Sequence, residues 1–561
     1  MDTSRFRAAI RTLRQWARYA GPGWLFCVCL LDPGNLFSDV QSGSEYAYSQ
    51  LWVQWWSQLF LLFTGWLCAR LVLCYLPLQD FAHVSAKHYR KPPVGRYVLW
   101  ALAELVVVAA DIPEVIGYGF GAHILFGIPV WAGVLLSASS TAMVLLLEWR
   151  DLRLVEVVVS ALLLALGVFL VASLALSGAD AGAFFYGWAV PTFRGSHAVY
   201  DALDIVGSVI MPHNLYLLTG SLVTHHMLSF MAVRMIEHAP AQERTERSDG
   251  EVPPQPVSTV EECGCGSAGG ACGCWRRVPS HDADITEVDT PDGPSSTQVV
   301  DSTSRTDAEN DRENGKCQPP LQEADSTVAE LPPVDTAELT KHVRPYTLEM
   351  VVPVLFAFFV NAAVTAIAAA HVYPLDASTK ANIGLYNFCD YLPFRGACVL
   401  WGLTLMASGQ VSTITTTLTG SYVMKGFLNL QIPLFLRAVL SRGTAILPGL
   451  IVAAATSEAT VNSIIGVVNA FLSFALPVVL VPLLRCTDER RRLHWFPKAF
   501  GWFFTASVYV LNVYSLYAPA GGILGQYAGA SDNFRASAQA NIMQDIILIG
   551  YTGMLAWLTF A

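Results

Sequence analysis

Charged residues are scarce in this chain of 561 residues. Asp, Glu, Lys and Arg together make up 14% of the sequence, whereas about 25% is usual for a soluble protein. Hydrophobic residues account for 53%, and the mean hydropathy is +0.43 even though one long segment is polar. This composition argues against a soluble globular protein and indicates an integral membrane protein.

Two short motifs are missing as well. The sequence contains no H-E-x-x-H motif or equivalent hydrolytic set, which argues against an intramembrane zinc enzyme. It also contains no N-x-S/T sequon, so N-glycosylation gives no information about topology. We therefore expect a protein that is not an enzyme.

Long apolar runs are abundant. A helix that crosses a bilayer needs about 20 mostly apolar residues, and the sequence contains about twelve such runs, which predicts an all-α polytopic membrane protein. The predicted spans are 20–42, 48–75, 97–123, 128–148, 153–177, 200–226, 348–371, 394–420, 436–456, 461–484, 498–518 and 540–560.

The short connections differ in their content of Lys and Arg. Connections poor in basic residues lie at 178–199 and 519–539. The basic connections all fall on one side if the spans alternate, and cytoplasmic loops are enriched in Lys and Arg. We therefore expect both termini in the cytoplasm. The basic segments are residues 1–19, Lys87–Lys91, Arg150 with Arg153, and Arg490–Arg492.

A polar insert separates the sixth and seventh predicted spans, at residues 228–345. It is rich in Asp, Glu, Ser, Thr and Pro and poor in aromatic residues, which is typical of a disordered segment. Its cysteines at 263–274 follow a C-x-C pattern. They either bind zinc or copper(I) or form a reduced loop without a ligand. Most other cysteines lie in apolar spans and are predicted to be packing residues.

Two tetrapeptides interrupt apolar spans, Asp32-Pro33-Gly34-Asn35 and Met211-Pro212-His213-Asn214. Proline opens or kinks a helix, and non-helical backbone at membrane depth is tolerated only inside protein or along a cavity. Such breaks in corresponding spans of two halves are typical of a transporter binding site. The side chains beside them, a carboxylate, amides, a thioether and an imidazole, favour a divalent transition metal.

These motifs resemble those of the Nramp family of proton-coupled divalent metal transporters. The resemblance covers nearly all of the chain outside the insert and the extreme C-terminus. It implies a LeuT-like fold, in which spans 1–5 and 6–10 form inverted repeats, two accessory helices follow, and spans 1 and 6 are interrupted near the midplane. The other matching segments are Gly21–Gly23, Asp39–Gln41, Asp111–Gly117, Met211–Tyr216, Ala407–Thr415 and Leu476-Pro477.

The resemblance also implies the ligands of the transported ion. Asp32, Asn35 and Met211 match the family's metal ligands, and Ser208 would contribute its backbone carbonyl. Asn469 stands where the family commonly has a Gln near the metal. A thioether suits Mn²⁺, Fe²⁺, Cd²⁺ or Co²⁺ better than Mg²⁺ or Ca²⁺, which prefer oxygen ligands.

Ionisable residues inside the spans predict a proton pathway. Glu104, Asp111 and Glu114 lie on one stripe of the third span, and intramembrane acids are costly without partners. Arg437, at the start of the ninth span, is the expected partner. His213 is a further candidate because its ordinary pKa lies near physiological pH.

The sequence therefore predicts a secondary active transporter that moves Mn²⁺ or Fe²⁺ toward the cytoplasm with protons. We expect no cofactor and no nucleic-acid partner. The membrane is either the plasma membrane or an endosomal or vacuolar membrane. Two alternatives stay open, a LeuT-fold symporter for an organic solute and a metal-sensing receptor that signals through the cysteine loop. The predicted organisation is 1–19, 20–227, 228–345, 346–484 and 485–561.

Overall fold

The computed structural model describes most of the helical part of the chain. The chain divides into two compact units, Met1–Met235 with Pro333–Ala561, and Ile236–Pro332. Almost everything described below belongs to the first unit. Residues 1–19, the cysteines at 263–274 and most of the predicted insert lie outside the described residues, which are 29–73, 78–92, 94–139, 167–193, 195, 197–237, 336–376, 380, 383–393, 396–430, 434–455, 458–490, 493–517 and 534–560.

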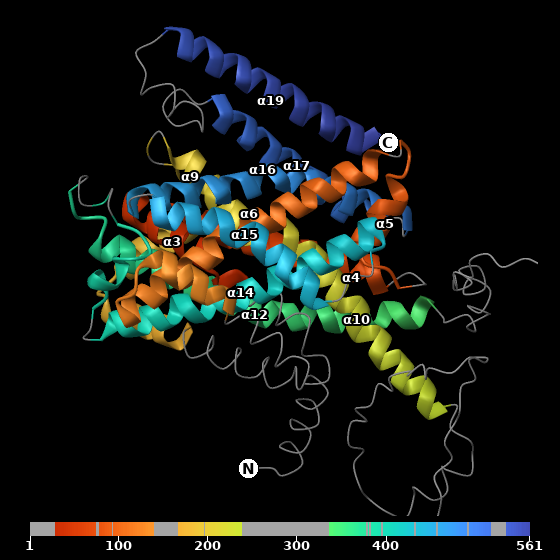
Figure 1. The fold of residues 1–561 in the computed structure, drawn as a ribbon, viewed down its shortest axis with the longest axis horizontal. Helices are drawn as coiled ribbons and strands as arrows, with labels where there is room; N and C mark the ends of the chain where they lie inside the picture. The colour runs from red at the N-terminus through yellow and green to blue at the C-terminus, as the bar shows by residue number, and fades with distance from the viewer. Residues whose placement is uncertain are drawn as a thin grey trace, which may run out of the picture. The chain divides into compact units, whose positions relative to one another are not determined.

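The described residues form helices and connections without any β-strand, as predicted (Figure 1). The elements of the N-terminal half are η1 (Cys29–Leu31), α3 (Pro33–Tyr46), α4 (Leu51–Leu73), α5 (Phe81–His88), α6 (Val94–Phe126), α8 (Ala181–Ala189), α9 (Ala198–Ile210) and α10 (Pro212–Glu237). Those of the C-terminal half are α12 (Thr336–His371), η2 (Phe388–Tyr391), α14 (Ala397–Leu428), α15 (Leu434–Ala455), α16 (Glu458–Arg490), α17 (Trp495–Tyr517) and α19 (Phe534–Phe560).

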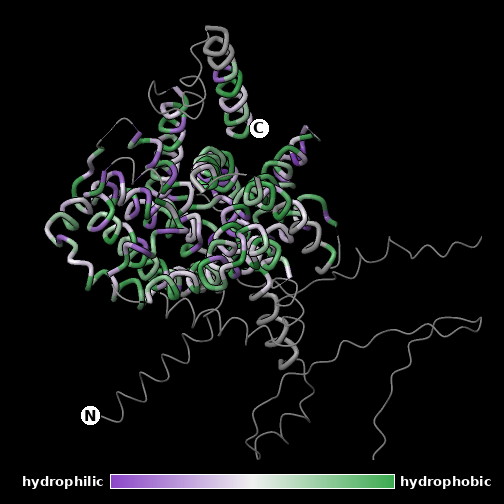
Figure 2. Tube along the Cα trace, turned by 60° about the vertical axis from the view of Figure 1, so that its left-hand side comes forward, coloured by the Kyte–Doolittle hydropathy of each residue, from purple (hydrophilic) through white to green (hydrophobic). Residues whose placement is uncertain are grey.

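Seven helical stretches of the described residues, one of which runs from α9 into α10, are long and apolar enough to cross a membrane. Shorter apolar helices, Val130–Ser139 and Gly167–Leu176, lie within the predicted fourth and fifth spans. Figure 2 shows that apolar residues predominate along the helices of this unit. The seven are Leu51–Leu73, Ala198–Thr224, Tyr346–His371, Ala397–Leu428, Thr460–Glu489, Trp495–Tyr517 and Met543–Phe560.

Helix extends further into the predicted insert 228–345 than composition indicates. α10 continues to Glu237, and α12 already begins at Thr336. Residues 228–236 are still largely apolar, and residues 336–342 contain Ala, Glu, Leu and Lys, which are good helix formers. The change in overall polarity therefore does not coincide with the ends of the helices.

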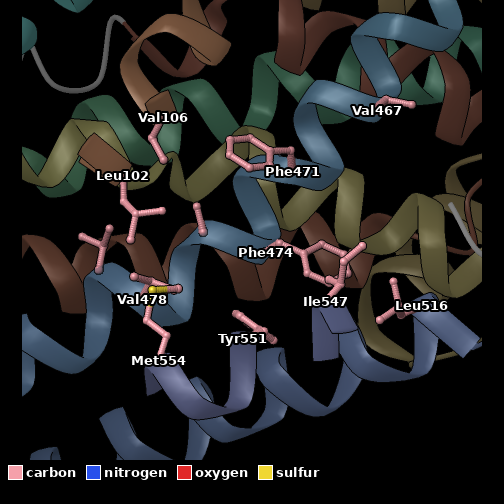
Figure 3. Close-up of a pocket in the computed structure, with 12 residues that line it drawn as sticks. Leu102, Val106, Val467, Phe471, Phe474, Val478, Leu516, Ile547, Tyr551 and Met554 are labelled. Atoms are coloured by element: carbon pink, nitrogen blue, oxygen red, sulfur yellow. The ribbon is translucent and has the colours of Figure 1, made fainter. Parts of the chain in front are cut away.

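The helices that matter for the site pack around α3. α3 contacts α6, α9, α12 and α16, while α14 lies along α6 and α16 along α9 (Figure 1). An apolar cavity of about 330 Å³ is lined by residues of α6, α16, α17 and α19 (Figure 3). Its walls, which include Leu102, Phe471 and Tyr551, contain no acidic or amide side chain. This cavity therefore does not provide the ligands of a cation site.

A glycine allows α9 and α16 to approach each other closely. A Cβ atom at Gly207 would lie 2.1 Å from the backbone oxygen of Asn469 and 2.7 Å from the backbone nitrogen of Ser473. Backbone atoms cannot yield as a flexible side chain can, so overpacking here costs about 1–3 kcal/mol or more.

We expect Gly207→Ala to separate α9 from α16 and so displace Ser208 and Asn469. Its melting temperature in detergent should therefore fall. Gly553→Ala on α19 is the matched control because nothing lies within 4 Å of a Cβ atom there. Equal melting temperatures for the two variants would show that the contact is unimportant.

Candidate metal-binding site

The predicted interruption of the sixth span lies at Met211. α9 ends at Ile210, α10 begins at Pro212, and Met211 between them has a φ of 32°. A non-glycine residue in this left-handed region costs free energy and is typical of functional sites. The Met211 amide still donates to the Gly207 carbonyl at 3.2 Å, and its carbonyl accepts from the Asn214 amide at 2.9 Å. The backbone therefore stays hydrogen-bonded while the helix axis is broken.

The other motif surrounds the start of α3. A short 3₁₀ turn ends at Leu31, Asp32 caps the helix, and Pro33 occupies the first helical position, where its missing N–H is not needed. The Asp32 Oδ1 atom accepts from the Asn35 backbone amide at 2.9 Å and from Asn35 Nδ2 at 2.7 Å. Its Oδ2 atom accepts from the Gly34 amide at 3.1 Å. The carboxylate is thus held in place and buried.

Long-range hydrogen bonds bring the two motifs together. The Ser38 and Ser208 hydroxyl oxygens lie 2.8 Å apart, joining α3 to α9. Ser38 also donates to the Gly34 carbonyl at 3.0 Å, and Asn469 Nδ2 on α16 donates to the same carbonyl at 3.1 Å. The structure therefore gathers four of the predicted ligand positions, Asp32, Asn35, Ser208 and Asn469, and Met211 follows Ser208 by three residues.

Two amide oxygens at this point are available to a cation. Asn35 Oδ1 and Asn469 Oδ1 are buried and have no hydrogen-bond donor among the described residues. The Met211 side chain is buried too, and Asn214 Nδ2 donates to its sulfur at 3.5 Å. A carboxylate, two amide oxygens and a thioether form a donor set of mixed hardness, which suits a divalent transition metal ion.

The third-span acids lie beside the Asp32 motif. A Cβ atom at Gly117 of α6 would lie 2.3 Å from the Pro33 Cβ, so the two helices touch directly at the motif. Asp111 and Glu114 are both buried on this part of α6. The Thr416 hydroxyl of α14 lies 3.0 Å from Glu114 Oε2 and 3.4 Å from Asp111 Oδ1. The predicted stripe of acids thus contacts hydroxyl groups of α14.

The remaining proton-pathway candidates lie on three helices. Glu104 is half-buried on α6, two turns before Asp111. His213 is buried in the first turn of α10, and its Nδ1 atom has no hydrogen-bond partner in the described part of the chain. Arg437 belongs to α15, which packs against α6, but its side chain lies outside the described residues. The pairing of Arg437 with these acids stays a prediction.

Several polar residues near the site are not among the predicted site residues. Asp39 accepts from Gln54 Nε2 at 2.6 Å, and Gln54 also lies 2.6 Å from the Thr365 hydroxyl oxygen. Asp201 and Asp204 lie on α9, where Tyr46 donates its hydroxyl to Asp201. Acidic residues inside an apolar span are functional candidates by default. The position of Asp201 and Asp204 in the predicted sixth span could therefore have identified them from the sequence.

A disulfide joins Cys389 of η2, in the connection between α12 and α14, to Cys398 in the first turn of α14. Cys68, by contrast, is a free and buried cysteine on α4, as expected of a packing residue. Spacing alone does not reveal which cysteines pair, so the sequence could not predict this disulfide.

Comparison with known proteins supports the resemblance seen in the motifs. A family model described as natural resistance-associated macrophage protein-like (Nramp) matches residues 23–247 and 326–518. The metal transporter Nramp6 of Arabidopsis thaliana is 28% identical over 500 residues, which cover 86% of this chain and 72% of the relative. The metal transporter Nramp3 of Oryza sativa subsp. japonica is 28% identical over 518 residues, which cover 89% and 73%.

Solved structures share the fold. The manganese transporter of Eremococcus coleocola, in complex with an aromatic bis-isothiourea substituted compound, matches with a TM-score of 0.67 and 21% identity. The match covers 98% of this chain and 95% of that one, and it confirms the predicted LeuT-like, all-α membrane fold. The relatives are metal transporters, which fits the expectation of a protein that is not an enzyme. Because the family model matches well over half of the chain, this integral membrane protein belongs to the Nramp family of metal transporters.

Proposed function

We propose that the protein is a secondary active transporter that moves Mn²⁺ and Fe²⁺ toward the cytoplasm together with protons. The observation that carries the proposal is the meeting of two helix breaks at one buried point. There Asp32 provides a negative charge, Asn35 and Asn469 provide amide oxygens without donors among the described residues, and Met211 provides a thioether. Neutralising a divalent ion inside a membrane requires such a carboxylate.

The donor set also favours particular ions. Mg²⁺ and Ca²⁺ prefer shells of oxygen atoms, whereas thioether sulfur favours softer transition metals. The solved relative is a manganese transporter, which supports Mn²⁺ as a substrate. The same chemistry extends to Fe²⁺, Co²⁺ and Cd²⁺. An organic solute such as an amino acid fits less well because Asp32 would repel its carboxylate.

Two hydrogen bonds between α3 and α9 support a role for these helices as a gate. Ser38 and Ser208 lie next to the metal site, and Tyr46 bonds to Asp201 at the far ends of the same helices. Both hydrogen bonds are between side chains, so α3 and α9 can separate there without the loss of these bonds disturbing the backbone of either helix. Because the breaks at Asp32 and Met211 lie at the inner ends of these helices, such a separation would open the site to one side, as alternating access requires.

The proton route uses the acids of α6. Asp111 and Glu114 lie beside the Asp32 motif, and Glu104 lies two helical turns closer to the start of α6. With Lys87–Lys91 in the cytoplasm, that direction leads to the cytoplasmic face. His213, directly after Pro212, connects this route to the metal site, and Arg437 on α15 supplies the positive charge that buried acids require.

The disulfide supports the proposed orientation with both termini in the cytoplasm. If residues preceding α12 are cytoplasmic, the connection between α12 and α14 lies on the opposite side. The Cys389–Cys398 disulfide ties that connection to the first turn of α14, and disulfides persist in oxidising compartments. The far side is therefore extracellular space or the lumen of an endosomal or vacuolar compartment, which agrees with the two membranes proposed.

Uptake into liposomes tests this function directly. We expect purified protein in liposomes to take up Mn²⁺, Fe²⁺ and Cd²⁺ from an acidic exterior, while an internal pH dye reports acidification that follows the metal. Mg²⁺ and Ca²⁺ should not enter. Protein-free liposomes and liposomes with a proton ionophore are the controls. Absence of metal uptake would overturn the proposal, and metal uptake without proton entry would overturn the proton coupling alone.

A further inference from the structure

Two carboxylates that the proposed metal site does not use lie on the same pair of helices. Asp39 follows Asn35 by one turn on α3, and its side chain is 1% exposed. Asp204 precedes Ser208 by one turn on α9, and its side chain is 3% exposed. Since the two helices run from the metal site to the Tyr46–Asp201 contact, both carboxylates lie between that contact and the metal site.

Each of these carboxylates has one oxygen without a donor in the described part of the chain. Asp39 Oδ1 accepts from Gln54 Nε2, but its Oδ2 atom accepts no hydrogen bond. Asp204 Oδ1 likewise accepts none, although Asp204 interacts with the side-chain amide of Asn469. Asn469 also donates to the Gly34 carbonyl. It therefore connects Asp204 with the Asp32 motif.

The two carboxylates lie among other acidic side chains. Asp39 interacts electrostatically with both Asp32 and Asp204, and Asp204 interacts with Asp201. None of the ion pairs in the described ranges includes any of these four aspartates. A buried carboxylate without a positive partner is costly, and a bound cation would offset that cost.

We propose that Asp39 and Asp204 form an outer binding site for a divalent cation, about one helical turn beyond Asn35 and Ser208 and thus outside the Asp32–Met211 site. This inference rests on the proposed transport function and adds to it a site that the ion occupies on its way to Asp32. The amide oxygen of Asn469, buried and without a donor among the described residues, is shared between the two sites.

The outer site differs chemically from the inner one. Its donors are carboxylate and amide oxygens, a set that accepts Mg²⁺ and Ca²⁺ as readily as Mn²⁺. The outer site therefore concentrates divalent cations of every kind, and the thioether of Met211 selects among them at the next step. Mg²⁺ and Ca²⁺ accordingly compete for the outer site without being transported.

Binding to a protein that lacks the inner site tests the proposal. We expect Asp32→Ala protein in detergent to retain weak Mn²⁺ binding in calorimetry, and Mg²⁺ to displace that ion. Adding Asp204→Asn or Asp39→Asn should weaken this remaining binding at least about tenfold, because each change removes one of the two carboxylates that attract the bound Mn²⁺. In the otherwise unaltered protein, Asp204→Asn should raise the KM for Mn²⁺ uptake and leave kcat nearly unchanged.

The control is Glu349→Gln, which removes a buried carboxylate from α12 and should leave binding and KM unchanged. Size-exclusion profiles and melting temperatures verify that each variant is folded.

If Asp32→Ala protein binds no Mn²⁺ although wild-type protein does, the outer site is overturned and the transport function stands. If wild-type protein binds no Mn²⁺, both fail. Unchanged binding after Asp204→Asn, with only the pH profile of uptake altered, would also overturn the outer site.

Discussion

Replacing Asp32 with Ala is expected to abolish Mn²⁺ uptake while the protein still folds. The change removes the one carboxylate of the inner site, and the remaining amide and thioether ligands are neutral. Inside a membrane, a divalent ion without a negative ligand is strongly disfavoured. We expect uptake by Asp32→Ala protein in liposomes to fall at least about a hundredfold, which corresponds to about 2.7 kcal/mol.

The loss of a helix cap must be separated from the loss of a ligand. Asp32 caps α3 by accepting from the Gly34 and Asn35 amides, and such a cap is worth about 0.5–2 kcal/mol. Asp180 caps α8 in the same way, accepting from the Gly182 and Ala183 amides, but is exposed. Asp180→Ala is therefore a matched control that should keep full uptake.

A third variant isolates the charge itself. Asp32→Asn retains an oxygen that can accept from the same backbone amides, so the start of α3 should be preserved, but the negative charge is gone. We expect it to be as inactive as Asp32→Ala and to melt at nearly the wild-type temperature. Near-normal Mn²⁺ flux in either Asp32 variant would remove Asp32 from the ligands of the ion.

The two helix breaks could be predicted from local sequence because their cause is local. Proline at 33 and 212 lacks an N–H group, which favours the first position of a helix, and the structure has α3 and α10 beginning at those residues. The stripe of acids on α6 was predictable for the same reason, since helical spacing alone places Asp111 and Glu114 on one side.

The assembly of the site could not be predicted in this way. The Ser38–Ser208 contact joins residues 170 positions apart, and the bond from Asn469 to Gly34 joins residues 435 positions apart. Such contacts depend on how α9 and α16 pack through Gly207, which no local pattern encodes. The resemblance to a family supplied the ligand identities, and the structure adds their hydrogen-bond partners and the carboxylates at 39 and 204.

Replacing Met211 with Ala is expected to change which ions are transported. The side chain is buried, and Asn214 Nδ2 orients its sulfur. Removing the thioether leaves oxygen donors, which costs little for a hard cation and more for a soft one. We expect Cd²⁺ uptake to fall at least about tenfold more than Mn²⁺ uptake, a difference of about 1.4 kcal/mol between the two ions.

The same variant should admit ions that the wild-type protein excludes. Selectivity is a difference between two affinities, so removing the ligand that favours soft ions should allow Ca²⁺ and Mg²⁺ to compete with Mn²⁺ or to pass. Competition assays at one fixed pH measure both effects. Met350→Ala on α12 is the matched control, because Met350 is equally buried and its loss should leave the ratio of Cd²⁺ to Mn²⁺ uptake unchanged. If Met211→Ala also keeps this ratio and still excludes Ca²⁺ and Mg²⁺, then Met211 is a packing residue and the ion must be selected by the oxygen ligands alone.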